Sequence, residues 1–265
     1  MLEKQRHQMI LEILEEQQFA SVKSLTEQLH SSEATIRRDI SKLAELQQLR
    51  RIRGGAEVLE SGDREAQRPS LNSSAFLLDR EKHTATKRAI AERAVSLCEE
   101  GDSIIINGGS STYMMGEFLN RRHLKILTNS FVLAQELVAN SHNQVTLPGG
   151  EIYPRQGIVL SAFDNDTIQY YHAGKMFMGT PGIGEFGVME SDPLLIRSEQ
   201  KLQRQSDELV ILADSSKLGR RSNLIFTPLE NVDVLITDSR APEKMIALLE
   251  GAGIEVLIVE YVESD

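Results

Sequence analysis

Residues 21–55 restrict the possible folds of this chain more than any other stretch. Apolar residues recur there at helical spacing in two short runs: Val22, Leu25 and Leu29, then Ile36, Ile40 and Leu43. Ser21 and Ser32 precede the two runs as candidate N-caps, because a serine oxygen accepts a hydrogen bond from the first turn of a helix. Only His30 and Ser31 separate the runs, so the stretch predicts a helix-turn-helix.

The second predicted helix carries a face that suits the major groove of DNA. At about 100° per residue, the positions opposite or beside its apolar side are small, hydroxyl-bearing or cationic. Together with the residue that opens the helix, they are the expected DNA-contacting positions: Ser32, Ala34, Thr35, Arg37, Arg38, Ser41 and Lys42. Ala34, Arg38 and Ser41 point most directly away from the apolar side, so they are expected to meet base edges.

Residues 49–56 predict a short hairpin after this helix. Gly54 and Gly55 permit the positive φ angles of a tight turn. Such a hairpin would act as a wing that brings Arg50, Arg51 and Arg53 beside the DNA backbone. The alternative is an ordinary amphipathic helix pair with a solvated charged face, but the order of turn, cap, cationic face and wing favours DNA binding.

This segment resembles the amino-terminal domain of the DeoR family of bacterial regulators of sugar metabolism. The matching residues form two groups: Thr35, Ile36, Arg37, Arg38 and Asp39 in the helix, then Arg50, Arg53, Gly54, Gly55 and Ala56 in the wing. The resemblance implies a winged helix-turn-helix that binds double-stranded operator DNA.

The net charge of the chain is −10, yet its distribution is compatible with DNA binding. Residues 32–55 hold six basic and three acidic residues. A local basic face on an acidic protein still attracts phosphate, and the acidic remainder disfavours indiscriminate binding.

Cys98 is the only cysteine, so no internal disulfide can form, and a reducing compartment fits. It shares a helical face with Ile90, Ala94 and Leu97, which indicates a buried apolar role rather than a reactive thiol. The N-terminus is charged from Glu3 onward, and no apolar run approaches the roughly 18 residues of a membrane span. We therefore expect a soluble cytoplasmic protein with no cofactor, no metal site and no membrane partner.

The length of 265 residues allows two domains and a linker. We expect a winged helix-turn-helix domain over residues 1–60, a polar linker over 61–80 and an α/β effector-sensing domain over 81–265. In the last of these, apolar strand-like runs alternate with amphipathic helices. This pattern is typical of a mainly parallel sheet covered on both faces.

Glycines and polar residues follow four predicted strands, at the end of an open sheet where ligands bind. The expected effector-binding residues are Asn107, Gly109, Ser110, Ser111, Thr128, Asn129, Gly149, Gly150 and Lys217. Residues 108–111 open a predicted helix, so their N–H groups and the positive helix end would suit a phosphate or carboxylate. Lys217 would supply a full countercharge. Plain turns are the alternative for each loop taken alone.

Residues 76–260 resemble the carboxy-terminal sensor domain of the same family, whose fold is similar to that of ribose-5-phosphate isomerase and glucosamine-6-phosphate deaminase. The matching positions are Gly101-Asp102, Gly109-Ser110-Ser111, Thr128-Asn129, Gly149-Gly150 and Asp214-Ser215-Ser216-Lys217. The resemblance implies a small anionic effector, a phosphorylated sugar or related metabolite. Many members carry Asp at the position of Asn107. The amide of this chain therefore lacks a negative charge that those members have. Glu199-Gln200-Lys201 and residues 214–219 are most similar to the branch that regulates ascorbate utilisation.

The favoured function is a repressor of an operon for the use of a sugar or carbohydrate derivative, released by such an effector. The alternative is a sugar-phosphate isomerase or deaminase with a DNA-binding domain, which needs a general base beside the substrate. The candidate bases, which form no recognisable catalytic constellation, are Asp192, Glu185, Glu199, His172 and His142. We expect a homodimer or homotetramer, because one recognition helix gives modest affinity. An activator remains open, since the sequence does not give the operator position.

Overall fold

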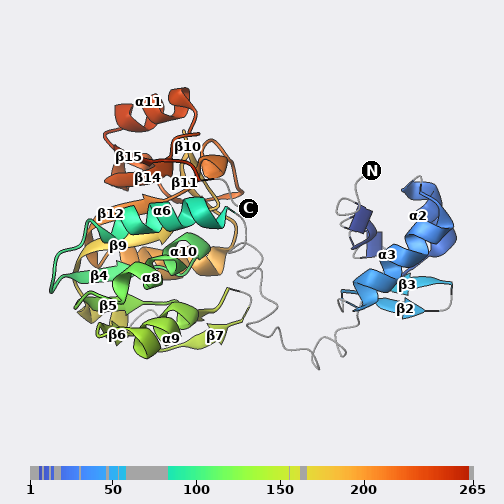
Figure 1. The fold of residues 1–265 in the computed structure, drawn as a ribbon, viewed down its shortest axis with the longest axis horizontal. Coiled ribbons are helices and arrows are strands. Elements are labelled where there is room, and N and C mark those ends of the chain that lie inside the picture. Colours follow the sequence, from blue (N-terminus) through green and yellow to red (C-terminus); the bar gives the residue numbers. More distant parts are fainter. Residues whose placement is uncertain are drawn as a thin grey trace. The chain divides into compact units, whose positions relative to one another are not determined.

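The computed structural model describes residues 6, 7, 9–11, 13, 14, 19–29, 31–45, 48–52, 54–57, 83–154, 156–161 and 166–262. The chain divides into two compact units, Met1–Arg68 and Pro69–Asp265, and each is considered by itself (Figure 1). The predicted domain boundaries at residues 60 and 80 lie outside the described residues.

The N-terminal unit contains the predicted helix-turn-helix and wing. Its elements are β1 (Phe19–Ser21), α2 (Val22–Gln28), α3 (Glu33–Glu45), β2 (Arg50–Ile52) and β3 (Gly55–Glu57). Both predicted N-caps form, since the Ser21 oxygen accepts from the Ser24 N–H at 3.0 Å and the Ser32 oxygen accepts from the Thr35 N–H at 3.2 Å. A first helical segment precedes β1, and its described residues are 6, 7, 9–11, 13 and 14.

The wing belongs to a three-stranded antiparallel sheet with the order β1-β3-β2. β1 was not predicted from the sequence. The two wing glycines have different roles: Gly54 adopts a positive φ of 88°, whereas a Cβ at Gly55 would collide with the Ala20 carbonyl oxygen of β1. The predicted apolar positions of both helices are buried in one core with residues of the first helical segment, the sheet and the link before β2. Its members are Ile10, Leu14, Ala20, Val22, Leu25, Leu29, Ile36, Ile40, Leu43, Leu49 and Ala56.

The C-terminal unit is built on a seven-stranded sheet with the order β15-β14-β12-β9-β4-β5-β6 (Figure 1). All of its neighbouring strands run parallel, which confirms the predicted sheet. The strands are β4 (Ser103–Ile106), β5 (Lys125–Thr128), β6 (Gln144–Thr146), β9 (Ala173–Gly179), β12 (Ser206–Leu212), β14 (Val234–Asp238) and β15 (Glu255–Val259).

Helices cover both faces of this sheet because successive strand side chains point to opposite sides. Ile104 and Ile106 pack with α6 (Thr84–Val95), α8 (Met115–Leu119) and α9 (Phe131–Asn140), which lie in front of the sheet in Figure 1. Ile105 packs in the second core with residues of α10 (Pro193–Gln203) and α11 (Glu243–Gly251). None of the helices in the described part of the chain is long and apolar enough to cross a membrane.

Several short elements differ from the sequence prediction. The helix expected from residue 110 onward is divided at Met114 into α7 (Ser110–Tyr113) and α8. Two small antiparallel sheets were not predicted: β7 (Glu151–Tyr153) with β8 (Ile158–Leu160), and β10 (Gly182–Gly184) with β11 (Gly187–Glu190) and β13 (Leu224–Thr227). Their strands are three or four residues long, too short for a periodic pattern to identify.

Cys98 is buried, as its helical face predicts, with 4% of its surface exposed. Burial, with a contribution from Asp102, raises the pKa of the thiol to about 11. The thiol is therefore not a nucleophile near neutral pH.

Candidate DNA-binding face and effector cavity

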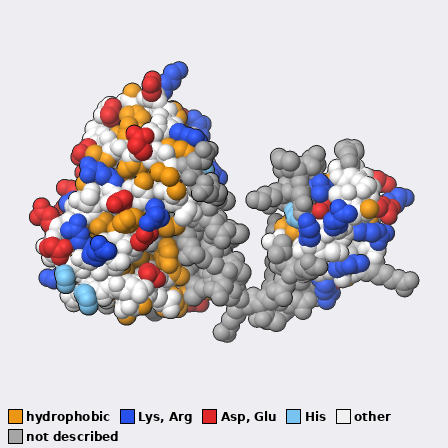
Figure 2. Space-filling view, viewed as in Figure 1, with side chains coloured by type: hydrophobic (Ala, Val, Ile, Leu, Met, Phe, Trp, Pro, Cys, Tyr) orange, Lys and Arg blue, Asp and Glu red, His pale blue; other side chains and the backbone are white. Residues whose placement is uncertain are grey.

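The outward face of α3 presents the predicted contact residues to solvent. Figure 2 shows one face of the N-terminal unit, and Lys and Arg side chains gather on it. Ser32, Ala34, Arg37, Arg38 and Lys42 are exposed, and Thr35 and Ser41 are half-buried. Among the described residues Arg38 forms no hydrogen bond or ion pair, so its guanidinium is available to a ligand.

Hydrogen bonds fix the wing against α3. Arg51 donates to the Ser41 hydroxyl at 3.1 Å, and this hydroxyl donates to the Arg37 carbonyl at 2.9 Å. Between helix and wing lies a concave surface of about 420 Å³ that Arg37 and Arg51 line. Arg50 pairs with Glu57 across the hairpin, and Arg53 lies outside the described residues. A concave surface with a cation on each side suits a phosphate backbone.

Asp39 anchors the inner side of α3, a role that the sequence did not reveal. The residue is 2% exposed, and its carboxylate accepts hydrogen bonds from Arg6 Nε and Nη2 and from His7 Nε2, the last at 3.1 Å. Burial alone would raise the pKa of Asp39, but the hydrogen bonds and charges of Arg6 and His7 outweigh it and hold the pKa below its usual range. The carboxylate therefore ties the first helical segment to the recognition helix.

We expect Asp39→Asn to loosen α3, because it removes the buried charge to which the half-buried Arg6 and His7 donate. The N-terminal unit should lose about 1–3 kcal/mol of stability. Hydrogen–deuterium exchange of α3 amides in the full chain should accelerate accordingly. Because the pKa of Asp39 is depressed, its contribution is fully present above the unfolded-state pKa and is lost as the pH falls through the lower folded-state pKa. Glu33→Gln on the exposed side of α3 is the matched control, and an equal effect there would contradict the assignment.

The C-terminal unit has a cavity at the point where its strand order reverses. From β4 the chain proceeds outward to β5 and β6, whereas β9, β12, β14 and β15 lie on the other side of β4. Loops that follow β4 and β9 diverge at such a point and leave a crevice beyond the strand ends. The cavity there has a volume of about 460 Å³, and its lining residues come from six segments: residues 108–111, Gln156, residues 179–181, Glu190 with Ser191, Leu195 with Glu199, and Lys217 with Arg220.

One part of the cavity is rich in donors and positive charge. Lys217 and Arg220 line it, and within the described chain neither forms a side-chain hydrogen bond or ion pair. Lys87 of α6 lies just beneath, 1% exposed, and donates to the Ser110 hydroxyl at 2.9 Å. Lys87 was not predicted as a site residue, although it precedes Ile90 and Ala94 on the buried face of α6 at helical spacing. The α7 helix has only four residues, so these cations and the loop N–H groups, rather than a helix dipole, favour an anion.

The structure brings together part of the predicted effector-binding set. Gly109, Ser110, Ser111 and Lys217 line the cavity. Three others are buried behind it: Asn107, Thr128 and Asn129. Asn129 supports the loop, since its Oδ1 accepts from the Gly108 N–H at 2.8 Å. Gly149 and Gly150 follow the edge strand β6 and do not line the cavity, because β6 lies two strands from β4, about 10 Å away.

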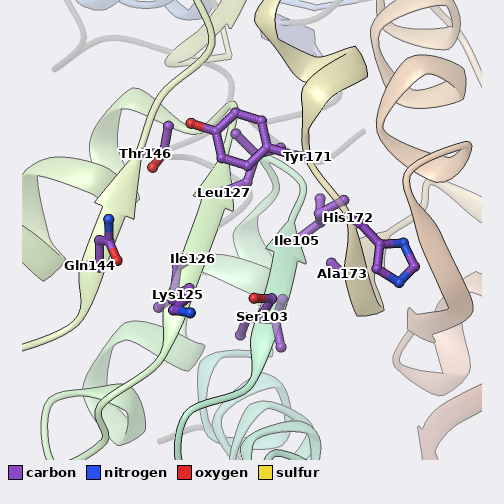
Figure 3. A pocket seen from close by; sticks show the side chains of 11 residues that line it. Ser103, Ile105, Lys125, Ile126, Leu127, Gln144, Thr146, Tyr171, His172 and Ala173 are labelled. Carbon is purple, nitrogen blue, oxygen red and sulfur yellow. The ribbon is translucent and has the colours of Figure 1, made fainter.

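Of the candidate general bases, Glu199 lines the cavity and the others do not. Asp192 caps α10, and Glu185 pairs with Arg221 on the surface. His142 is exposed. His172 lies beside a small depression of about 130 Å³ over β4 and β5, where its ring points away from Tyr171 (Figure 3). Its side chain is 73% exposed and 3.4 Å from Asp207. The described residues thus assemble no acid–base pair from this set.

Two family models match the chain. The DeoR-like helix-turn-helix domain matches residues 6–62, and the DeoR C terminal sensor domain matches residues 82–239. The HTH-type transcriptional regulator UlaR of Shigella dysenteriae serotype 1 (strain Sd197) is 35% identical over 260 residues, 98% of this chain and 100% of the relative. The UlaR of Escherichia coli O1:K1 / APEC has the same identity and coverage.

Solved structures with partial similarity include an isomerase and a translation factor. The match to ribose 5 phosphate isomerase A from Neisseria gonorrhoeae covers 51% of this chain and 53% of the isomerase chain, with 20% identity and a TM-score of 0.36. The match to eIF2B beta from Chaetomium thermophilum covers 66% of this chain and 54% of the eIF2B beta chain, with 15% identity and a TM-score of 0.42.

Proposed function

The chain belongs to the DeoR family of transcriptional regulators, and from this premise we propose that it represses an operon for the use of a sugar or carbohydrate derivative. A phosphorylated, sugar-like effector enters the cavity of the C-terminal unit and releases the protein from its operator. The relatives are named as regulators, and the chain is a regulator rather than an enzyme. Their similarity over nearly the whole chain supports membership of the branch that regulates ascorbate utilisation.

One observation carries this proposal: a recognition face and an anion-suited cavity occur in the same chain. The face offers an exposed Arg38 beside the concave surface that Arg37 and Arg51 line. The cavity offers Lys217 and Arg220 without ion-pair partners in the described chain. A regulator of this kind needs ligand binding without turnover, and such a cavity is sufficient for binding.

Self-association completes the proposal. One recognition helix contacts a single half-site with modest affinity, so a homodimer or homotetramer is needed for tight operator binding. Analytical ultracentrifugation of the full chain gives its mass, and a monomer that binds DNA tightly would contradict this part.

Capture of genomic fragments by the purified protein, followed by sequencing, identifies the operator. Footprinting on that operator with and without phosphorylated sugars then tests release, and a reporter gene in cells that lack the protein distinguishes repression from activation. Increased reporter expression in these cells supports a repressor. Reduced expression would indicate an activator, and a protein that selects no DNA would contradict the proposal.

Salt should weaken operator binding steeply, and Arg37 should account for part of this dependence. Each neutralised phosphate adds roughly 0.9 to the slope of log affinity against log salt, so Arg37→Ala should reduce the slope by about 0.9 per bound subunit. The preferred DNA sequence should stay unchanged, because a phosphate contact carries no base information. Lys244→Ala, an equal loss of charge on α11, is the control. A changed sequence preference with an unchanged slope would mean that Arg37 contacts bases.

A further inference from the structure

Glu199 brings a buried carboxyl group into the effector cavity. Its side chain lies on α10, is 4% exposed and lines the cavity. Oε1 accepts a hydrogen bond from Asn107 Nδ2 at 3.0 Å. Oε2 is buried and has no hydrogen-bond partner among the described residues. A buried polar atom without a hydrogen-bond partner costs free energy. This oxygen is therefore available to form a hydrogen bond with a ligand.

The charges around Glu199 disfavour its ionised form. The titratable side chains near it come from four segments: Glu190 of β11, Asp192 at the start of α10, Lys217 and Arg220 after β12, and Lys87 of α6 at the Ser110 loop. None of the cations forms an ion pair with Glu199. Burial is the largest effect, and with the charges of Glu190 and Asp192 it outweighs the Asn107 hydrogen bond and raises the pKa of Glu199 to about 8.

Asn107 decides which carboxyl oxygen carries the proton. An amide N–H is a donor, so Oε1 must accept, and the proton of the neutral acid lies on Oε2. An Asp at position 107 would offer only oxygens and would leave this choice open. The Asn107–Glu199 pair thus leaves a buried O–H donor on a residue that lines the cavity.

We propose that Glu199 selects the effector by donating a hydrogen bond from Oε2 to a carbonyl or carboxylate oxygen, so that effector binding requires a proton on this residue. The inference rests on the proposed function, since it concerns the same cavity. It adds the chemical class of the effector, a phosphorylated compound with an acceptor oxygen, and makes operator release dependent on pH.

A matched pair of probes tests this selection. 6-Phosphogluconate and glucitol 6-phosphate differ only at C1, which is a carboxylate in the first and a CH₂OH group in the second. Calorimetric titration of the full chain between pH 6.5 and 9.5 should show that the first binds at least about tenfold more tightly at low pH. Its affinity should fall by about 30-fold at pH 9.5, as Glu199 loses its proton.

Glu199→Gln is the control variant because its amide keeps an N–H donor and has no charge to lose. It should retain the preference for 6-phosphogluconate with no decline at high pH. Inorganic phosphate, which needs only the cationic part of the cavity, should bind both proteins alike and reports on that part alone. Failure of inorganic phosphate to bind would contradict the proposed anion site instead.

Three results would overturn the role of Glu199. The first is a wild-type protein that binds 6-phosphogluconate no better than glucitol 6-phosphate. The second is a Glu199→Gln protein with the same fall in affinity at high pH as the wild type. The third is a Glu199→Gln protein that loses 6-phosphogluconate while inorganic phosphate still binds, because glutamine keeps the donor.

Discussion

Replacing Arg38 with alanine is expected to abolish operator binding at concentrations where the wild-type protein occupies its site. Arg38 lies on the exposed face of α3 and has no partner within the described chain, so its guanidinium is free to make a bidentate contact with a base. Loss of that contact costs about 1–3 kcal/mol per half-site. A dimer on two half-sites would lose roughly 30-fold to 10⁴-fold in affinity. Footprinting across a protein titration measures this loss.

Arg38→Lys distinguishes a base contact from a phosphate contact. Lysine keeps the positive charge but cannot form the two parallel hydrogen bonds of a guanidinium. If Arg38 contacts a base, the lysine variant should bind nearly as weakly as the alanine variant; recovery of most of the affinity would indicate a phosphate contact. An unchanged Arg38→Ala footprint, with an unchanged circular dichroism spectrum, would mean that another face of α3 reads the DNA.

The N-terminal unit could be predicted closely because its determinants are local. The two serine caps, the apolar spacing and the turn at Gly54 each act within a few residues, and all appear in the structure. β1 could not be predicted, because Phe19–Ser21 becomes a strand only by pairing with the backbone of β3. Asp39 was visible as part of a motif, but its role depends on Arg6 and His7, more than thirty residues earlier. Contacts between distant residues leave no periodic signal in the sequence.

The cavity could be predicted in part for a similar reason. Parallel strands share an edge, so the loops after β4 and β12 were expected to meet, and both line the cavity. The order of strands along the sheet cannot be read from the chain, however. β9 lies between β4 and β12 and adds residues 179–181, whereas β6 lies at the edge and keeps Gly149 and Gly150 away. Glu199 appeared as a candidate base, but only its partner Asn107 and its unpaired oxygen indicate a proton donor.

Lys217→Ala is expected to weaken effector binding by about one to two orders of magnitude, because a charge-assisted hydrogen bond to an oxyanion is worth roughly 1.5–3 kcal/mol. Lys217 ends a short turn whose Asp214 side chain accepts from the Ser216 N–H at 3.0 Å. Asp238 accepts from the Ser215 and Arg240 N–H groups, so neither carboxylate forms an ion pair with Lys217. Among the described residues, therefore, nothing competes with the ligand for the lysine charge. Competition between effector and operator DNA, followed by fluorescence anisotropy, measures the change.

Two variants separate the charge of Lys217 from its structural surroundings. Lys217→Arg keeps a cation in the cavity and should recover most of the response, whereas Lys244→Ala, an exposed loss of charge outside the cavity, should respond as the wild type does. The Lys217→Ala protein should stay on its operator at effector concentrations that release the wild type. A normal response in this variant, or a neutral sugar that binds as tightly as its phosphate ester, would contradict an anionic effector held by Lys217. Loss of operator binding without effector would instead mean that Lys217 supports the fold, because a cation that serves only the ligand leaves the free protein unchanged.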